Sequence, residues 1–487
     1  MFTPTRTILK VQAASFALNV TFLSPIEPDD LARQSFPFSY VYVDGATTDG
    51  KAHTIELYMD ITGEWVTSDA KTPIQWQSNE TISSAYLQVR PVSLSTNFQD
   101  LAEDGTVFHA MSSVRIVFFF CSFDLCYSFF RWAMKLNSTI SPLISDLPTG
   151  QGKVENTDGK WPVLAHYVNL GSIRQIPTTA WAVGLVRHPV IIFRGMPQYG
   201  YYWSRWSTIG DAIDAFVADF PAANSRALAL DNRILADAHN ISPDYADLVS
   251  LGLRQALAGM ELTLSPDNNG NYNPSNVVAF LKNNGNSEGV NPTETIYALM
   301  PALLYLNSDL LKALLEPLLQ FQASSEYPNS YAAPDLGGPY PNVPGNTQDN
   351  HIMGVEHSAN MIIMVLAYAR TTGNGKLLAK YYHTLKTWGS FLINNTLAGS
   401  QDPADVVSAV PNLQIKGIIG VGAIAQISAV VGDVDAAKEF QAAVSNLTQV
   451  WMNSSSINGM MYNLFADKLL QLGTFPDTVR DFMFGLL

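Results

Sequence analysis

Three carboxylates, Asp335, Glu356 and Asp402, lie in loops that each enter an apolar segment with helical periodicity. Hydrolysis needs a positioned water, a base that activates this water and an acid that protonates the leaving group. Two carboxyl groups in different environments can divide these roles between them. We expect Glu356 to take one role and either Asp335 or Asp402 to take the other, because the three loops should reach the same rim of the helical part.

Glu356 ends a long irregular segment, residues 327–356, which lies between two strongly apolar stretches. A loop of about thirty residues inside a compact domain is usually functional, because its unpaired backbone must be held in place. The apolar run at 361–368 predicts a buried helix, so Glu356 should lie at a helix N-terminus, where free amides favour a negative charge. The alternative is that Glu356 only complements the helix dipole, with Ser358 and Asn360 as polar surface.

Three further side chains, Arg254, Tyr340 and Asn360, are candidates for binding a substrate. A guanidinium group can hold a carboxylate through two parallel hydrogen bonds. Arg254 could act in this way, or it could be a buried structural partner of Asp247 or Glu261. Tyr340 belongs to the long loop, and Asn360 belongs to the start of the helix that follows it.

The sequence argues against several other kinds of site. His351 and His357 do not have the spacing that places two metal ligands on one helical face, so we expect no metal. The two cysteines, Cys121 and Cys126, are too few for a Cys-based zinc site. A serine triad lacks its Gly-x-Ser-x-Gly elbow. The glycines at 417–422 lie in an apolar helix rather than after a strand, so we interpret them as sites of close helix packing and not as a phosphate loop.

Composition sets the outer limits. With 487 residues, 47% of them hydrophobic and 14% charged, the chain can bury cores in two or three domains. A net charge of −14, without a cluster of Lys and Arg, excludes a nucleic-acid partner. The strongly aromatic residues 113–135 include Asp124 and Arg131, each of which would cost roughly 3 kcal/mol at the centre of a bilayer. We therefore expect no membrane helix and interpret this stretch as an insert that the fold did not select, the alternative being a buried pair of strands.

Residues 1–205 carry the pattern of β-strands, with short runs rich in Val, Thr, Tyr and Phe that are separated by turns such as Asp44-Gly45 and Asp49-Gly50. Representative runs are 16–22, 54–61, 85–89 and 180–186. Many short strands without intervening helices predict an antiparallel β-sandwich as the first domain. The aromatic residues 199–206 could stack on a sugar, but packing between the domains is their expected role.

From residue 206 to residue 487 the apolar residues recur with a helical period. Short polar breaks such as Gly373-Asn374-Gly375 join consecutive helices into antiparallel hairpins. No exact repeat is present, so we expect a closed α/α toroid, with loops ringing a funnel at one end, rather than a regular solenoid. Helices are expected at 245–260, 292–306, 309–323, 356–372, 376–395, 413–431, 434–451 and 459–472.

Sequons of the form Asn-x-Ser/Thr favour a secreted protein with N-linked glycans, although chance alone yields several in a chain of this size. No signal peptide is expected at the start of the sequence, because a basic region followed by a continuous apolar region is missing. The sequons begin at Asn19, Asn79, Asn137, Asn240, Asn394, Asn446 and Asn453.

Several runs of residues are specific when they are taken together. They are TFLSPIEP at 21–28, AEDGTV at 102–107, YADLVSL at 245–251, LEPLL at 315–319, YAAPDLG at 331–337, GVE at 354–356, KGIIG at 416–420 and YNLFADKLL at 462–470. With these runs, the chain resembles the fungal secreted glutaminase A family over nearly its whole length, except in the aromatic stretch. The resemblance implies an N-terminal β-sandwich, a six-hairpin α/α toroid, and hydrolysis of L-glutamine to L-glutamate and ammonia outside the cell without a cofactor.

The chain also departs from the pattern of this family. Where the family usually reads Val-Glu-Glu, the chain has His357 after Glu356, and of an acidic pair in a second loop only Asp402 matches. Family members begin well before Met1 and continue past Leu487 through further helices, so we expect the toroid to be incomplete. Two alternatives stay open. One is a glycoside hydrolase, which uses the same toroid and two carboxylates about 5–9 Å apart. The other is a truncated family member without catalytic activity.

Overall fold

The computed structural model describes residues 1–69, 72–98, 101–113, 117–121, 151–154, 163–267, 270, 272–282, 289–347, 353–398, 410–454, 461–476 and 479. The chain divides into two compact units. Unit 1 contains Met1–Ile191, Pro197–Ala258 and Leu264–Ser275, and unit 2 contains Ile192–Met196, Gly259–Thr263 and Asn276–Leu487.

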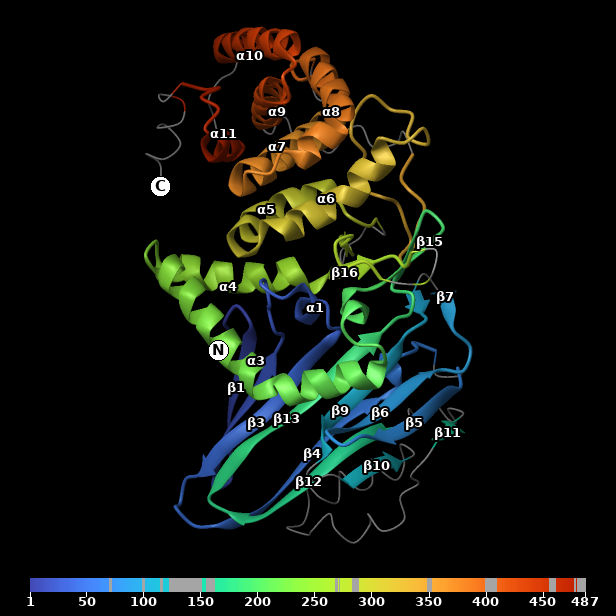
Figure 1. Ribbon diagram of the computed structural model, residues 1–487. Coiled ribbons are helices and arrows are strands. Elements are labelled where there is room, and N and C mark those ends of the chain that lie inside the picture. The colour runs from blue at the N-terminus through green and yellow to red at the C-terminus, as the bar shows by residue number, and fades with distance from the viewer. Residues whose placement is uncertain are drawn as a thin grey trace. The chain divides into compact units, whose positions relative to one another are not determined.

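Unit 1 is built on an eight-stranded antiparallel sheet with the strand order β1-β2-β3-β13-β9-β6-β5-β11 (Figure 1). A three-stranded sheet, β10-β12-β4, packs against one of its faces. Two short strands, β7 (Ser95–Phe98) and β8 (Leu101–Glu103), pair with each other. The bounds of the other strands are β1 (Arg6–Ala13), β2 (Phe16–Leu23), β3 (Phe38–Thr47), β4 (His53–Thr62), β5 (Ile74–Glu80), β6 (Ser84–Pro91), β9 (Thr106–Ser112), β10 (Val117–Cys121), β11 (Gln151–Val154), β12 (Val163–Ile173) and β13 (Gln175–Val186).

The alternation of side chains along each strand separates two apolar cores. On β9, Val107 and Met111 face the three-stranded sheet, where they are buried in clusters with residues such as Leu164 of β12. Two residues that alternate with them on β9, Phe108 and Ala110, face the opposite way, toward helix α3 (Ile209–His239). Because successive side chains of a strand point to opposite faces, this sheet is covered on both sides.

Helix α3 lies across the outer face of the large sheet (Figure 1). It begins with a capping box, in which Thr208 and Asp211 each accept a hydrogen bond from the backbone of the other. The Phe216 ring stacks on Tyr40 with the ring centroids 4.0 Å apart, and the Tyr40 hydroxyl donates to the carbonyl of Phe216 at 2.5 Å. A second helix, α4 (Pro243–Ala258), follows α3 and belongs to the same unit.

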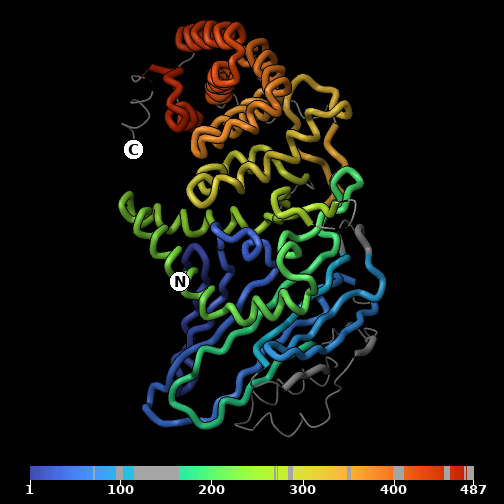
Figure 2. Tube along the Cα trace, viewed as in Figure 1, coloured from blue at the N-terminus to red at the C-terminus, as the bar shows by residue number. Residues whose placement is uncertain are grey.

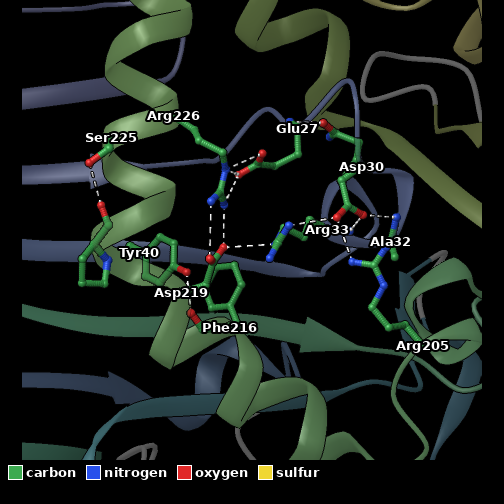
Figure 3. Close-up of polar contacts among 12 residues, drawn as sticks. Glu27, Asp30, Ala32, Arg33, Tyr40, Arg205, Phe216, Asp219, Ser225 and Arg226 are labelled. Atoms are coloured by element: carbon green, nitrogen blue, oxygen red, sulfur yellow. Dashed lines mark hydrogen bonds and ion pairs between the residues drawn. The ribbon is translucent and has the colours of Figure 1, made fainter.

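A network of ion pairs joins α3 to the segment that contains α1 (Leu31–Gln34), as Figure 3 shows. Arg226 donates to Glu27 at 2.7 Å and to Asp219 at 2.5 Å. Arg33 lies 3.3 Å from Asp219 and 3.0 Å from Asp30. Glu27 belongs to one of the runs that carry the family resemblance, and through Arg226 it joins the segment that follows β2 to α3.

Unit 2 consists mainly of helical hairpins, seen from yellow to red in Figure 2. Consecutive hairpins contact each other through their first helices, α5 with α7 and α7 with α9, and also through α6 with α7 and α8 with α9. Since α7 and α9 are apolar on nearly all sides, they form the core, whereas α8 and α10 present one polar face. The helices are α5 (Thr293–Leu306), α6 (Ser308–Gln322), α7 (Gly354–Thr372), α8 (Lys376–Asn395), α9 (Val410–Val431), α10 (Val434–Ser454) and α11 (Leu464–Leu470).

Short strands complete the fold. In unit 2, β14 (Ile191–Phe193) pairs in parallel with β18 (Asn342–Val343), and β16 (Met260–Leu264) pairs antiparallel with β17 (Val278–Leu281). The strand β18 lies within the long segment that we expected to have no regular structure. A further strand, β15 (Met196–Gly200), precedes a turn of 3-10 helix at Tyr201–Ser204, and another such turn, Gly63–Trp65, follows β4.

The predicted order of an antiparallel sheet domain followed by a helical domain is confirmed. Strands give way to helices near the predicted boundary at residue 205, whereas the compact units divide after α4. Part of the aromatic insert does belong to the fold, because Val117–Cys121 forms β10 and pairs with β12. Residues 114–116 and 122–135 of that stretch lie outside the described residues.

One described helix, residues 411–431, is long and apolar enough to cross a membrane. Its most apolar window is 72% buried inside the protein, as is usual for a core helix. The length and the apolar composition of α9 are therefore explained by its burial in the core of unit 2.

Candidate active site

Helix α7 begins at Gly354 and places Glu356 in its first turn, as the sequence predicts. No side chain caps this end of the helix, so its free amides favour a carboxylate. Every residue from Val355 to Ala369 except Glu356 is buried, and the Glu356 side chain is 14% exposed. The carboxylate therefore lies between solvent and the apolar core of unit 2.

One oxygen of Glu356 receives two hydrogen bonds. Lys416 of α9 donates to Oε1 in an ion pair, and its side chain is only 4% exposed. Asn360, one turn further along α7, donates from Nδ2 to the same oxygen at 3.0 Å. Among the residues that the structure describes, none donates to Oε2. The described hydrogen bonds of this carboxylate therefore all go to Oε1.

The ring of Tyr297, on α5, covers the ammonium group of this ion pair. Lys416 Nζ lies 4.3 Å from the centroid of the ring, within the range of a cation–π interaction. Burial lowers the pKa of Lys416, and the charge of Glu356 opposes this effect. Burial raises the pKa of Tyr297, and the nearby charges of Glu356 and Tyr462 act in the same direction. The cluster therefore combines one ion pair with a phenol that stays neutral.

The residue after Glu356 holds α7 on its other side. His357 is 1% exposed, and its Nε2 lies 2.7 Å from Oε1 of Glu294, in the first turn of α5. The Glu294 side chain is 47% exposed, so this pair joins a buried ring to a group in solvent. The first turns of α5, α7 and the beginning of α9 are in this way tied together by polar side chains.

The long loop crosses the same ends of the helices. The backbone amide of Ala332 donates to the Ser358 hydroxyl on α7 at 2.9 Å. The backbone amide of Thr293, the first residue of α5, donates to the carbonyl of Pro334 at 2.8 Å. These two bonds place Asp335, the next residue, at the end of the α5–α7 pair where Glu356 lies.

Asp335 is engaged within its own loop. Its Oδ1 accepts hydrogen bonds from the backbone amide of Gly337 at 2.7 Å and from Asn346 Nδ2 at 2.8 Å. A Cβ atom at Gly289 would lie 2.3 Å from Asp335 Oδ2, so a glycine is needed there for the carboxylate to fit. Asp335 therefore shapes the loop.

The other predicted site residues are not gathered in the same way. Arg254 belongs to unit 1, where it donates to the backbone carbonyl of Arg6 at 3.2 Å and to the Thr7 hydroxyl at 2.6 Å. Lys282 Nζ lies 5.1 Å from the centroid of the Tyr340 ring. Asp402, like His351, lies outside the described residues. Of the predicted binding residues, only Asn360 touches Glu356.

Sequence reasoning missed four members of this cluster, namely Glu294, Tyr297, His357 and Lys416, as parts of the site. A signal was present for Lys416, because a lysine between isoleucines in an apolar helix must find a charged partner when it is buried. The partner itself could not be named, since Glu356 is 60 residues away in the sequence.

Two further features bear on the kind of site, namely the placement of metal-binding side chains and a cavity in unit 2. Among the described residues, no group of three or more His, Cys, Asp or Glu side chains is placed to hold a metal ion. A cavity of about 310 Å³ lies between α9, α10 and residues 472–474, lined by polar groups that include Gln426, Gln441 and Thr448. Glu356 and its partners do not line this cavity, so the two places are distinct.

Two family models match consecutive parts of the chain. Residues 242–483 match the glutaminase A six helical-hairpin domain, and residues 5–237 match a domain of unknown function, DUF5127. The chain belongs to the glutaminase A six-hairpin family. Glu356, Lys416, Asn360 and Tyr297 all lie within the six-hairpin domain of this family.

Relatives with curated names agree with this family. The chain is 29% identical to Glutaminase A of Aspergillus oryzae, in an alignment that covers 99% of this chain and 72% of the relative. It is 26% identical to a probable glutaminase of Arthroderma benhamiae, over 96% of this chain and 64% of that relative. The chain thus spans about two thirds to three quarters of the length of these glutaminase A relatives.

Solved structures give only distant likenesses. A bacterial glucoamylase complexed with acarbose matches 91% of this chain and 56% of its own, with a TM-score of 0.41 and 8% identity. A GH92 family glycosyl hydrolase matches 90% of this chain and 46% of its own, with a TM-score of 0.32 and 9% identity. At these TM-scores the likenesses carry no argument about the activity of this glutaminase A family member.

Proposed function

We propose that the protein hydrolyses the side-chain amide of L-glutamine to give L-glutamate and ammonia. The observation that carries this proposal is the Glu356 carboxylate, which Lys416 and Asn360 fix at the start of α7 in a domain named for glutaminase A. The names of the two curated relatives support the same substrate.

In the proposed reaction, Glu356 Oε2 accepts a proton from a water molecule while the water oxygen bonds to the amide carbon of the substrate. The carbonyl oxygen takes the displaced electron pair. When this tetrahedral intermediate collapses, the carbon–nitrogen bond breaks, and the nitrogen leaves as ammonia after it takes up a proton from a carboxyl group. Water and amide are thus converted to acid and ammonia without any other reactant.

Either Asp335 or Asp402 is the proposed source of the proton that ammonia takes up, and Glu356 returns its own proton to that carboxylate through solvent. The place of Asp335 in a loop bonded to the first residue of α5 and to Ser358 supports its inclusion. Arg254 and Tyr340 stay predictions as substrate-binding residues. Asn360 is supported more directly, because it bonds to Glu356.

Secretion and N-linked glycosylation belong to the same proposal. The sequon residues Asn240, Asn394, Asn446 and Asn453 are exposed, which supports modification there. Asn19 is partly buried and donates to Asp44 at 2.8 Å, and Asn137 lies outside the described residues. L-Glutamine, as a small molecule, is the partner that this reading requires.

The test is ammonia release from L-glutamine by the wild-type protein and by Glu356→Gln, measured in a coupled assay. We expect the variant to lose at least about 100-fold in kcat, since general base catalysis contributes on that order or more. Glu326→Gln is the matched control, because Glu326 also lies in unit 2 and pairs with Arg194 but is 58% exposed. Full turnover by Glu356→Gln would exclude this residue as the base.

The ammonia assay, together with an assay of sugar release from aryl glycosides, separates the alternatives. A glycoside hydrolase would release sugar from aryl glycosides and no ammonia from glutamine. A catalytically inactive family member would do neither, although its thermal unfolding would show that it is folded.

A further inference from the structure

We propose that Lys416 is a positioning residue, which holds Oε1 of Glu356 so that Oε2 meets the reacting water. This inference rests on the proposed hydrolysis of an amide at Glu356. It assigns to Lys416 a role in the reaction that goes beyond the stability of the helical core.

The burial of Lys416 is the first step of the argument. Its side chain is 4% exposed, and its neighbours Ile415 and Ile418 on α9 are fully buried. A buried ion pair is seldom more stabilising than well-packed apolar residues of similar volume, because both charges lose their hydration. Stability alone therefore favours a methionine or leucine at this position, and the lysine needs another reason.

The second step is the geometry around Oε1. Lys416 and Asn360 both donate to this oxygen, so its lone pairs are occupied. The Tyr297 ring, 4.3 Å from Nζ, restricts the ammonium group on another side. Because groups from α7 and α9 hold Oε1, this orientation of the carboxylate is favoured, and Oε2 keeps one direction in it. A base held in one orientation avoids the loss of rate that comes with misplacement.

The third step is the close approach of the two helices. A Cβ atom at Gly420, one turn after Lys416, would lie 3.0 Å from Ala359 Cβ on α7. This glycine lets α9 approach α7 closely enough for Lys416 to reach across to Glu356. The backbone of both helices, and not a mobile loop, therefore carries the contact.

The charged and titratable groups around Glu356 come from every neighbouring element. Lys416 lies on α9, Glu294 and Tyr297 on α5, His357 on α7, and Tyr462 before α11. Among the described groups of this cluster, Lys416 is the one whose ammonium group pairs with Glu356. Removing it should make the carboxylate gain a proton at higher pH, because an adjacent cation favours the ionised form.

The experiment compares the wild type with Lys416→Met, which keeps the apolar length of the side chain without the charge. We expect kcat for L-glutamine to fall about 100-fold, the loss associated with a misplacement of about 1 Å, while KM changes less than about threefold. The acidic limb of the profile of kcat/KM against pH should move upward, because the adjacent cation is lost. Lys386→Met is the control, because Lys386 pairs with Asp433 at 2.8 Å and is 40% exposed.

A second variant keeps the test decisive if Lys416→Met does not fold. Lys416→Arg retains the cation in a different shape, so we expect its acidic limb to stay near that of the wild type while kcat falls. Unchanged kcat and an unchanged pH profile in a folded Lys416→Met protein would overturn the proposal. An acidic limb that moves as far in Lys416→Arg as in Lys416→Met would also overturn it.

The proposed function fails separately, if the wild-type protein releases no ammonia from glutamine. In that case the orienting role is tested without substrate, by carbon-13 NMR of labelled glutamate carboxyl groups. The signal that Glu356→Gln removes should titrate at higher pH in Lys416→Met, and an unchanged titration would contradict the proposal.

Discussion

Two buried imidazole rings pack edge to face between the sheets of unit 1. His109 of β9 and His166 of β12 are fully buried, and their ring centroids are 4.3 Å apart. His166 Nε2 lies 2.9 Å from the carbonyl oxygen of His109. Burial lowers the pKa of His166 to about 4, and burial together with the neighbouring ring holds the pKa of His109 well below its usual value of 6.5. Both rings are therefore neutral in the folded protein at pH 7.

This pair predicts that unit 1 loses stability in mild acid. The unfolded chain binds protons at these histidines near pH 6.5, whereas the folded chain binds a proton at His166 only near pH 4 and at His109 only well below pH 6.5. Their contribution to stability is therefore complete above pH 6.5 and is lost as the pH falls toward 4, at up to about 1.4 kcal/mol per pH unit for each group. His109→Leu should flatten this dependence in urea unfolding followed between pH 7 and pH 5.

His53→Gln is the control for this prediction. His53 pairs with Asp49 at the surface, where both side chains are about a third exposed. Its replacement should leave the slope of stability against pH as in the wild type. A His109→Leu protein with the same loss in acid as the wild type would show that other groups govern the transition.

Single residues differ in how far the sequence alone could assign them. Glu356 could be found because a loop and the start of an apolar helix are local features, and the structure confirms its place in the first turn of α7. Lys416 and Tyr297 could not be assigned to it, since their contacts join separate helices. Arg254 illustrates the opposite case, because its type suits a carboxylate ligand while its bonds go to Arg6 and Thr7 of β1.

Elements could be predicted well where the apolar pattern is local. The helix expected at 376–395 is α8 (Lys376–Asn395), and the helix expected at 434–451 begins with α10 at Val434. The strand expected at 16–22 is β2 (Phe16–Leu23). The pairing of strands such as β13 with β9, in contrast, depends on contacts between distant segments, which periodicity does not contain.

The glycines of α9 allow an element-scale test. We interpreted the glycines at 417–422 as sites of close packing, and this is confirmed, since a Cβ atom at Gly420 would lie 2.8 Å from Leu392 and 3.0 Å from Ala359. Gly420→Ala should therefore destabilise the protein by about 1–3 kcal/mol, the usual cost of overpacking, although alanine favours helix formation. Displacement of α9 should also lower activity, because Lys416 lies one turn away.

The matched control for Gly420→Ala is Gly252→Ala in α4. Gly252 is exposed, and a Cβ atom there would meet nothing within 4 Å. We expect this variant to be unchanged or more stable by up to about 1 kcal/mol, as the helix propensities of glycine and alanine imply. If the two substitutions change the free energy of unfolding in urea equally, α9 and α7 can move apart without loss of stability.

At the scale of the whole molecule, sequence reasoning could order the two domains but not divide the compact units. Composition and period locate the change from strands to helices near residue 205, whereas contacts assign α3 and α4 to unit 1. The reason is visible in the contacts between the start of the chain and α3. Asp231 of α3, which is 1% exposed, accepts from the Thr5 amide at 2.9 Å and pairs with Arg6 at 2.9 Å, and no local pattern relates these positions.

This clamp predicts how unit 1 responds to the loss of one charge. Asp231→Asn leaves the buried guanidinium of Arg6 without its carboxylate, and breaking such a pair costs about 3–5 kcal/mol. Asp49→Asn removes a surface pair with His53 and is the control, from which we expect no measurable change in unfolding by urea. Because Glu356, Lys416 and Asn360 all lie in unit 2, the kcat of folded Asp231→Asn should stay close to that of the wild type at 25 °C. A fall in kcat at unchanged stability would instead mean that the clamp acts on the active site, and its effect would then have to pass from the sheet to the helical hairpins.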